Sequence, residues 1–248
     1  MLVIDVGNTN IKSAVWDGYQ LIDCSSFGTL NGDIENDFES CWLTHTSLIR
    51  KVLVSNVAAS QVCDRIKQFC KTYLDITPEF VVPQKVCMGM STRYQHPSTL
   101  GVDRWLASLA AWTLSRGSVC VVDVGTALTV DVVVANGEHV GGLIAPGPDM
   151  LKASLVLGTA GLEIDQFSPI DRFGINTVEA ISLGCRSALK GVLREVEQQL
   201  DMLGISETTS WHLTGGAADT VRGLIPNKHI DSPRLVLEGL VVLGLHVD

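Results

Sequence analysis

The chain has 248 residues, 46% hydrophobic and 18% charged, which is enough apolar material for one large domain or two of ordinary size. Its formal net charge is −9, and no run of like charge occurs, which argues against a nucleic-acid surface built from clustered Lys and Arg. No apolar run reaches membrane-spanning length and a strand pattern opens the chain without a targeting segment, so we expect a soluble, cytoplasmic protein that needs neither nucleic acid nor membrane.

The first half of the chain begins with strand patterns and continues with two helical ones. The predicted strands are Leu2–Asp5, Ile11–Trp16, Gln20–Cys24, Val52–Ser55 and Glu79–Val82. A helix is predicted from Ser60, with an apolar face of Val62, Ile66, Phe69 and Tyr73, and another from Gly101. The predicted order is β-β-(β)-α-β-α-β, and a polar stretch from Asn31 to Ser40 lies between the third strand and Val52.

The second half restarts the same order at Val119. Its predicted strands are Val119–Asp123, Leu128–Val134, His139–Leu143 and Trp211–Thr214. A long amphipathic helix is predicted from Gly184 to Leu203, and its apolar stripe suits either the core or a subunit contact. A last helix is predicted to begin with Ser232 as N-cap and Pro233 at its first position, and to continue to Leu245.

Two copies of a three-stranded meander followed by helices and further strands predict a ribonuclease H-like domain used twice. The two domains would cover residues 1–116 and 117–248. The alternative is a single doubly wound sheet in which the two similar halves are accidental.

Each half opens with a strand, a short acidic glycine motif and a returning strand. The motifs are Asp5-Val6-Gly7-Asn8-Thr9 and Asp123-Val124-Gly125-Thr126. Such a turn exposes backbone N–H groups and small hydroxyls, and its carboxylate can hold a hydrated cation. Two of them facing each other would hold a polyphosphate, whereas one alone could be an Asx-type turn without a ligand.

Two other segments carry candidate chemistry. Gly215-Gly216 follows a strand and would let a base or ribose pass close to the backbone, although a tight strand-to-helix connection also explains a glycine there. Asp103-Arg104 begins the helix near Gly101. Asp103 could cap that helix beside a solvent-facing arginine, or accept a substrate proton while Arg104 or the helix start holds a substrate anion.

The cysteines and histidines carry no recognisable site. The seven cysteines have no metal-ligand spacing, and several lie in apolar runs, which favours reduced thiols that fill the core. The six histidines are dispersed with no pair at zinc spacing.

The ordered set of motifs resembles the actin, Hsp70 and sugar-kinase superfamily and, within it, the type III pantothenate kinases. The matching segments are Asp5-Val6-Gly7-Asn8-Thr9-Asn10-Ile11-Lys12, Tyr94 with Leu100-Gly101-Val102-Asp103-Arg104, Asp123-Val124-Gly125-Thr126, Gly141–Gly147, Asn176–Ile181 and Leu237–Leu240. The resemblance implies an α/β fold of two duplicated ribonuclease H-like (actin-like ATPase) domains with a nucleotide cleft between them.

The resemblance also implies ATP-dependent phosphorylation of pantothenate, the first step toward coenzyme A, by a homodimer whose pantothenate pocket lies near the subunit interface. The implied ATP contacts are Asp5 through Lys12 and Thr126, and the implied pantothenate contacts are Tyr94, Gly101, Val102, Asp103, Arg104 and Thr177. Asp103 would accept the proton of the substrate hydroxyl. Mg²⁺ would bridge the phosphates through water near Asp5, and Asp123 would bind a monovalent cation, potassium or ammonium.

A second class of function stays open at this point. Members of the family have also been described as transcriptional accessory factors, in which ATP would switch a conformation without a small-molecule acceptor. Tyr94 with Gly101 to Arg104 favours the kinase, because a pure switch has no need of a base for a substrate hydroxyl.

Overall fold

The chain divides into two units. The structure is a computed structural model that describes residues 1–29, 34–58, 60–158 and 172–246. The first unit comprises Met1–Leu114, Gly137–His139 and the residues from Arg234 onward, and the second comprises Ser115–Asn136 and Val140–Pro233. The chain therefore passes between the units more than once, whereas the expected boundary after residue 116 divides it at a single position.

The first unit contains a five-stranded sheet in the order β3-β2-β1-β4-β5. The strands are β1 (Leu2–Val6), β2 (Asn10–Trp16), β3 (Leu21–Gly28), β4 (Val52–Asn56) and β5 (Glu79–Phe80). Strand β1 pairs antiparallel with β2 and parallel with β4, so the end of β1 lies between two neighbours. The predicted opening hairpin is confirmed.

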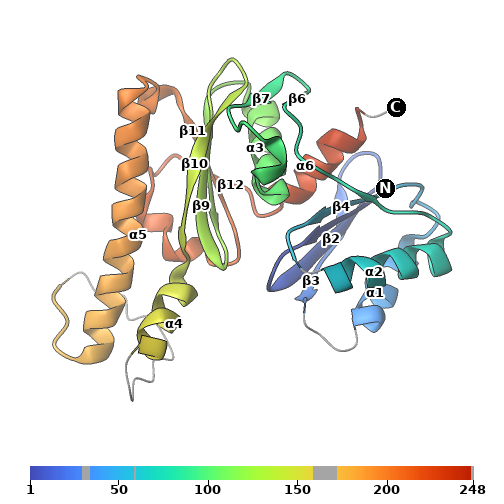
Figure 1. Ribbon diagram of the computed structural model, residues 1–248, viewed down its shortest axis with the longest axis horizontal. Helices are drawn as coiled ribbons and strands as arrows, with labels where there is room; N and C mark the ends of the chain where they lie inside the picture. The colour runs from blue at the N-terminus through green and yellow to red at the C-terminus, as the bar shows by residue number, and fades with distance from the viewer. Residues whose placement is uncertain (30–33, 59, 159–171, 247–248) are drawn as a thin grey trace. The chain divides into compact units, whose positions relative to one another are not determined.

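Helices cover both faces of this sheet (Figure 1). On one face, Leu2, Ile4 and Val6 of β1 share a buried core with α1 (Ile34–Trp42) and α2 (Ser60–Phe69), because alternate residues of a strand point the same way. On the other face lies α6 (Leu235–Gly244). A Cβ on Gly244 would come within 2.8 Å of Leu53 Cδ1 in β4, so the end of α6 packs closely on the strand.

The second unit repeats the strand order of the first. Its strands are ordered β10-β9-β8-β11-β12, with β8 and β9 antiparallel and β8 and β11 parallel, and the sheet has seven strands because it continues beyond β10 with β7 (Met90–Thr92) and β6 (Val86–Cys87) of the first unit. The strands are β8 (Val119–Val124), β9 (Ala127–Val133), β10 (Glu138–Pro146, which begins in the first unit), β11 (Ser210–Thr214) and β12 (Ile230–Asp231). The same order and directions around a central strand confirm the predicted duplication and exclude one doubly wound sheet.

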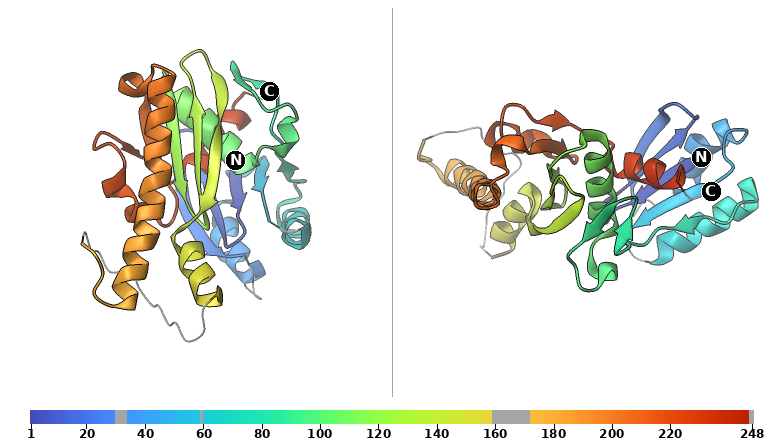
Figure 2. Two further views of the ribbon diagram at one scale, coloured as in Figure 1. Left: turned by 60° about the vertical axis from the view of Figure 1, so that its left-hand side comes forward. Right: turned by 90° about the horizontal axis from the view of Figure 1, so that it is seen from above.

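Helix α5 (Thr177–Met202) lies along the strands of the second unit (Figure 2). Leu189, Leu193, Val196 and Leu200 of α5 are buried in one core with residues of β8, β9 and β11. The apolar stripe of the helix is therefore core within its own unit. No helix among the described residues is long and apolar enough to cross a membrane.

Four elements were not predicted, and one begins later than predicted. These four, α4 (Pro148–Gly158), β6 (Val86–Cys87), β7 (Met90–Thr92) and β12, are short or weakly patterned. Helix α1 lies in the polar stretch, where the predicted order has a helix, and residues 31–33 of that stretch are outside the described residues. Helix α6 begins at Leu235 and not at Ser232. The Ser232 hydroxyl lies 3.0 Å from His212 Nδ1, so it serves that ring and caps no helix.

Candidate functional site

The first glycine turn joins β1 to β2 and is fixed from two sides. Gly7 N donates to Asn10 O at 2.9 Å, and a Cβ on Gly7 would lie 3.1 Å from that oxygen. Thr29 at the end of β3 donates from Oγ1 to Gly7 O at 2.8 Å and from its backbone N to Thr9 O at 2.9 Å. The side chains of Asn8 and Thr9 are exposed. The turn therefore offers small polar groups from a fixed backbone, which suits phosphate oxygens.

Asp5 stands one residue before the end of β1, with a hydroxyl and an ammonium on neighbouring strands. Its register partners are Lys12 on β2 and Ser55 on β4. Ser55 Oγ donates to Asp5 Oδ1 at 2.9 Å. Because side chains that pair across antiparallel strands share a face, the Lys12 and Asp5 side chains lie on the same side of the sheet. A carboxylate beside a hydroxyl and a lysine suits a hydrated divalent cation and the phosphate that accompanies it.

The start of α3 (Val102–Ser115) brings the substrate motif together. Asp103 Oδ1 accepts from Arg104 N at 2.8 Å, and a Cβ on Gly101 would lie 2.6 Å from the same oxygen, so the glycine leaves room for this carboxylate. Arg104 is only 8% exposed, and its Nη1 donates to the Tyr94 hydroxyl at 3.4 Å. The interpretation with a solvent-facing arginine is therefore wrong. A buried arginine that donates to a phenol and follows directly after a carboxylate suits an anionic, hydroxyl-bearing ligand.

The second glycine turn joins β8 to β9 in the second unit and is supported by the segment that follows β10. Gly125 N donates to Ala127 O at 2.9 Å, and Gly147 N donates to Thr126 O at 3.1 Å. A Cβ on Gly147 would lie 2.5 Å from both Gly125 O and Thr126 O, so only glycine fits there. Thr126 is exposed. This turn also offers a hydroxyl from a fixed backbone.

Asp123 stands beside the second turn and is packed against Gly215. A Cβ on Gly215 would lie 2.5 Å from Asp123 Oδ1 and 2.3 Å from Val124 O, and Gly215 has φ +97°. The Asp123 carboxylate and the Val124 carbonyl therefore pack so closely on the Gly215 backbone that a side chain there has no room. A carboxylate oxygen beside such a turn is a ligand that hard cations take. Close passage of a base or ribose at this double glycine stays a prediction, and a Cβ on Gly216 would meet nothing within 4 Å.

Thr177 is the first residue of α5, and its helix end is well capped. The Asn176 side chain accepts from Glu179 N at 2.9 Å, and Glu179 Oε2 accepts from Ile175 N at 3.2 Å. Thr177 is exposed and borders a groove of about 630 Å³. The groove is lined by Leu155, Gly174, Ile175, Asn176, Thr177, Ala180, Ile181 and Gly184.

The predicted site residues thus form clusters within each unit. The first unit brings Asp5 and Lys12 together in one cluster and Tyr94, Asp103 and Arg104 in another. The second unit holds a cluster at Asp123 and Thr126 and, at the start of α5, Thr177. No group of three or more His, Cys, Asp or Glu side chains suited to a metal occurs among the described residues, so a cation at Asp5 or Asp123 would complete its coordination with water or backbone oxygens.

Thr29 and Gly147 were missed as supports of the two turns. Neither lies near its turn in sequence, and only the pairing of β3 with β2 and the chain path after β10 bring them there. For Gly147, the Gly141–Gly147 segment was a signal, but it did not reveal the contact with Thr126.

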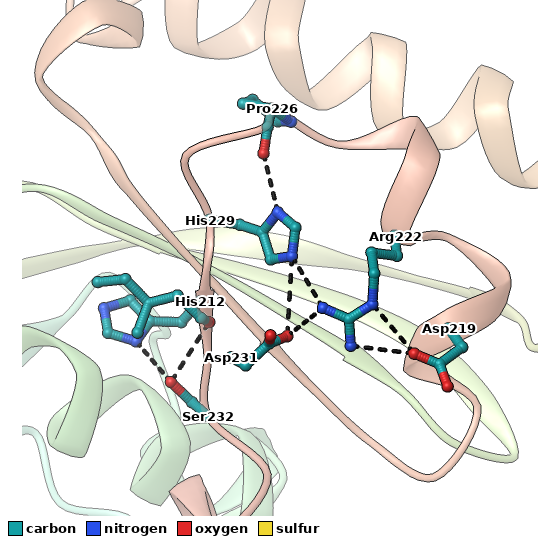
Figure 3. Close-up of polar contacts among 8 residues, drawn as sticks. His212, Asp219, Arg222, Pro226, His229, Asp231 and Ser232 are labelled. Atoms are coloured by element: carbon teal, nitrogen blue, oxygen red, sulfur yellow. Dashed lines mark hydrogen bonds and ion pairs between the residues drawn. The ribbon is translucent and has the colours of Figure 1, made fainter.

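Burial describes the cysteines of the core, and hydrogen bonds hold two histidines of the second unit in place. Burial raises the pKa of the Cys70 thiol to about 12, and all seven cysteines are free. His212 is buried between two hydroxyls, with Nε2 at 2.8 Å from Ser115 Oγ. On the other side, its Nδ1 lies 3.0 Å from Ser232 Oγ (Figure 3). Near it, His229 lies against the Arg222 guanidinium, which is paired with acidic side chains on both sides.

The free energy of unfolding should decrease as pH falls below about 6.5 because of His212. Burial lowers the pKa of His212 from its ordinary value of 6.5, so between that lowered pKa and 6.5 the unfolded chain binds more protons than the folded one. For a difference of one bound proton, the free energy of unfolding decreases by up to about 1.4 kcal/mol for each pH unit. Urea unfolding at several pH values between 5 and 8 should show that the free energy of unfolding decreases less with falling pH in His212→Gln than in the wild type. His246→Gln, at an exposed position, is the control, and equal slopes in all three proteins would contradict the interpretation.

Comparison with known proteins decides the family. A model of the type III pantothenate kinase family matches residues 1–199. The chain is 36% identical to the type III pantothenate kinase of Nitrosomonas eutropha, covering 98% of this chain and 94% of that protein. It is 32% identical to that of Nitrosococcus oceani, covering 97% and 92%. This chain belongs to the type III pantothenate kinase family.

Solved structures agree with the fold of this family. A Baf family protein from Campylobacter jejuni is 22% identical with a TM-score of 0.57, covering 98% of this chain and 96% of that one. The activator of 2-hydroxyisocaproyl-CoA dehydratase from Clostridium difficile is 14% identical with a TM-score of 0.54, covering 98% and 93%. The expected two-domain actin-like ATPase fold is confirmed. All the site residues expected for a type III pantothenate kinase lie within the matched residues 1–199.

Proposed function

We propose that this type III pantothenate kinase family member transfers the γ-phosphoryl group of ATP to the primary hydroxyl of pantothenate, which is the first step of coenzyme A biosynthesis. The observation that carries the proposal is the start of α3. There Asp103, the buried Arg104 and Tyr94 are held together. Pantothenate bears both a carboxylate and a primary hydroxyl, which match a guanidinium and a proton-accepting carboxylate.

Each residue at the start of α3 has a proposed role. Asp103 orients the hydroxyl and accepts its proton as the new bond forms. Arg104, together with the Tyr94 hydroxyl, binds the carboxylate of pantothenate, and the backbone of Gly101 and Val102 allows close approach. Catalysis of this kind is mostly positioning and charge neutralisation around an in-line transfer.

The two glycine turns are the proposed phosphate sites. The backbone and side chains of the first turn would bind ATP, with Lys12 supplying positive charge, and Thr126 would contribute a hydroxyl from the second turn. The members of the first set are Asp5, Val6, Gly7, Asn8, Thr9, Asn10, Ile11 and Lys12. Asp5 would hold Mg²⁺ through water, since Mg²⁺ keeps most of its own hydration in such sites and neutralises phosphate charge.

The proposed activity is tested by ADP release from the purified protein with and without pantothenate. We expect release only when pantothenate is present, and none with an analogue in which hydrogen replaces the primary hydroxyl. Equal release with and without pantothenate would favour the regulatory alternative, in which ATP turnover switches a conformation. We place the reaction in the cytoplasm and involve neither membrane nor nucleic acid in it.

Activity should require a monovalent cation bound at Asp123. The Asp123 carboxylate stands near the end of β8, beside the second glycine turn, where a bound cation would offset the phosphate charge in place of a lysine. Potassium or ammonium should support turnover, while sodium or a bulky organic cation at the same ionic strength should not. Asp123→Ala should lose the response to potassium, whereas Asp131→Asn, a buried aspartate of β9, should keep it. Equal rates in all the salts would refute this role.

The protein should be a dimer that shares the substrate pocket near Thr177. Phe173 and Ile175, beside the start of α5, are 90% and 81% exposed and adjoin the groove bordered by Thr177, and large exposed apolar side chains of this kind favour an interface. Sedimentation at micromolar protein should give a species near twice 26.7 kDa. Phe173→Asp should weaken it, while Tyr19→Asp, an exposed aromatic in the first unit, should not. A fully active wild-type monomer would contradict the shared pocket.

A further inference from the structure

A buried histidine lies directly beside the tyrosine of the substrate motif. His139, near the start of β10, is 0% exposed, and its ring centre is 5.9 Å from that of Tyr94 with the planes 33° apart. His139 Nδ1 lies 3.0 Å from Thr92 Oγ1. Nothing in the sequence pattern marked His139, because its neighbours in space come from a segment more than forty residues earlier in the chain.

The Thr92 hydroxyl connects this ring to the backbone of Tyr94. Tyr94 N donates to Thr92 Oγ1 at 3.2 Å, so the hydroxyl is bound from two sides. With the backbone N–H as its donor, the hydroxyl can give its own proton to His139 Nδ1, which is the acceptor in a neutral ring protonated at Nε2. The parallel register of β10 and β7 places His139 opposite Thr92, and Arg93 N donates to His139 O at 3.0 Å.

Lys85 also fixes the backbone from Thr92 to Tyr94. Lys85 Nζ donates to Thr92 O at 2.6 Å and to Tyr94 O at 3.1 Å. The backbone on either side of Tyr94 is therefore held, and His139 packs against its ring. The other end of the phenol is the hydroxyl that accepts from Arg104 Nη1. One chain of contacts thus runs from His139 through Thr92 and Tyr94 to the buried guanidinium.

We propose that His139 is a positioning residue for pantothenate: it holds the Tyr94 ring so that the phenol hydroxyl and Arg104 meet the carboxylate of the substrate together. The proposal rests on the function proposed above and adds a residue to which no role had been given. His139 touches neither the hydroxyl that reacts nor the phosphates in this scheme. Its loss should therefore affect binding of pantothenate and leave both the chemical step and ATP binding nearly unchanged.

His139→Asn is the main test, because the Asn side-chain oxygen can replace Nδ1 as acceptor for Thr92 while the ring is lost. We expect the KM for pantothenate to rise about tenfold, in the range of a lost hydrogen bond to a charged group. The kcat and the KM for ATP should stay within about twofold of the wild type. His212→Gln is the matched control, since His212 is also buried between hydroxyls but lies in the second unit, and it should leave the KM for pantothenate unchanged.

A double-mutant cycle shows whether His139 acts through Tyr94. Tyr94→Phe removes the hydroxyl that meets Arg104 and should itself raise the KM for pantothenate. If His139 works by placing that hydroxyl, His139→Asn should add at most about twofold in the Tyr94→Phe background. Additive effects, or a KM for pantothenate that His139→Asn leaves within twofold of the wild type, would overturn the proposal.

Thr92→Val provides the same test if His139→Asn does not fold, because Val keeps the shape of Thr92 and removes only the hydroxyl that joins His139 to Tyr94. It should also raise the KM for pantothenate selectively, and an equal rise for ATP would point to a general loss of structure and contradict the proposal. Wild-type protein without any pantothenate-dependent ADP release would refute the proposed function and this inference with it. Normal turnover in the wild type with an unchanged KM in both variants would refute this inference alone.

Discussion

Asp103→Asn is expected to lower kcat by about 10²–10⁴-fold, the usual contribution of a positioned general base. The substitution separates the two roles that the geometry allows for Asp103. The Asn side-chain oxygen can still accept from Arg104 N, the bond that Asp103 Oδ1 makes at 2.8 Å, so the start of α3 keeps its cap. What is lost is the capacity to take the proton of the substrate hydroxyl.

The measurement is steady-state turnover with pantothenate, together with urea unfolding of both proteins. The KM for pantothenate should change little, and the midpoint of unfolding should match that of the wild type. Asp149→Asn is the matched control, because Asp149 is also in the first turn of a helix, α4, but is exposed. Near-normal turnover of Asp103→Asn would mean that Asp103 only caps its helix.

Gly215→Ala should lower the free energy of unfolding by about 2–4 kcal/mol, from backbone strain at a positive φ together with overpacking. The added Cβ would lie 2.3 Å from Val124 O and 2.5 Å from Asp123 Oδ1, and φ at this residue is +97°. The backbone oxygen cannot move without disturbing β8, because Ala217 N donates to it at 2.9 Å. The Asp123 carboxylate should therefore be displaced.

The neighbouring glycine offers a control for this prediction. A Cβ on Gly216 would meet nothing within 4 Å, so Gly216→Ala should change the free energy of unfolding by no more than about 0.5 kcal/mol. Urea unfolding measures both variants. The potassium concentration that gives half-maximal activity should rise in Gly215→Ala and stay the same in Gly216→Ala. Equal stabilities in the two variants would show that the turn at Gly215 relaxes without cost.

The duplicated fold was predictable because its signal is local. In each half, an apolar strand, an acidic glycine turn and a returning strand predict a hairpin. The antiparallel pairs of β1 with β2 and of β8 with β9 are these hairpins. Helix α1 follows the same rule, because Ile34, Phe38 and Trp42 recur at the spacing of one helical face and all three are buried. Ser232 shows the reverse case, since its cap pattern was clear but the His212 ring takes the hydroxyl.

The candidate site was predictable as a set of residue types but not as a set of contacts. The sequence indicated Asp103, Arg104 and Tyr94, but whether the arginine faces solvent depends on how α3 packs, and it proved to be buried. The support that Gly147 gives the second turn and the contact of Gly215 with Asp123 join segments distant in the chain. Contacts of that kind follow from topology, which local patterns do not specify.

Helix α6 completes the first unit, so this unit cannot finish folding on the ribosome until α6 has been synthesised. Leu235 and Leu240 of α6 are fully buried, and a Cβ on Gly239 would come within 2.3 Å of Leu106 O in α3. The N-terminal sheet therefore keeps one apolar face uncovered until α6 has been synthesised, and an uncovered apolar face exposes a nascent chain to aggregation and chaperones. A premature stop codon before Leu235 would thus damage the part of the protein that was made first.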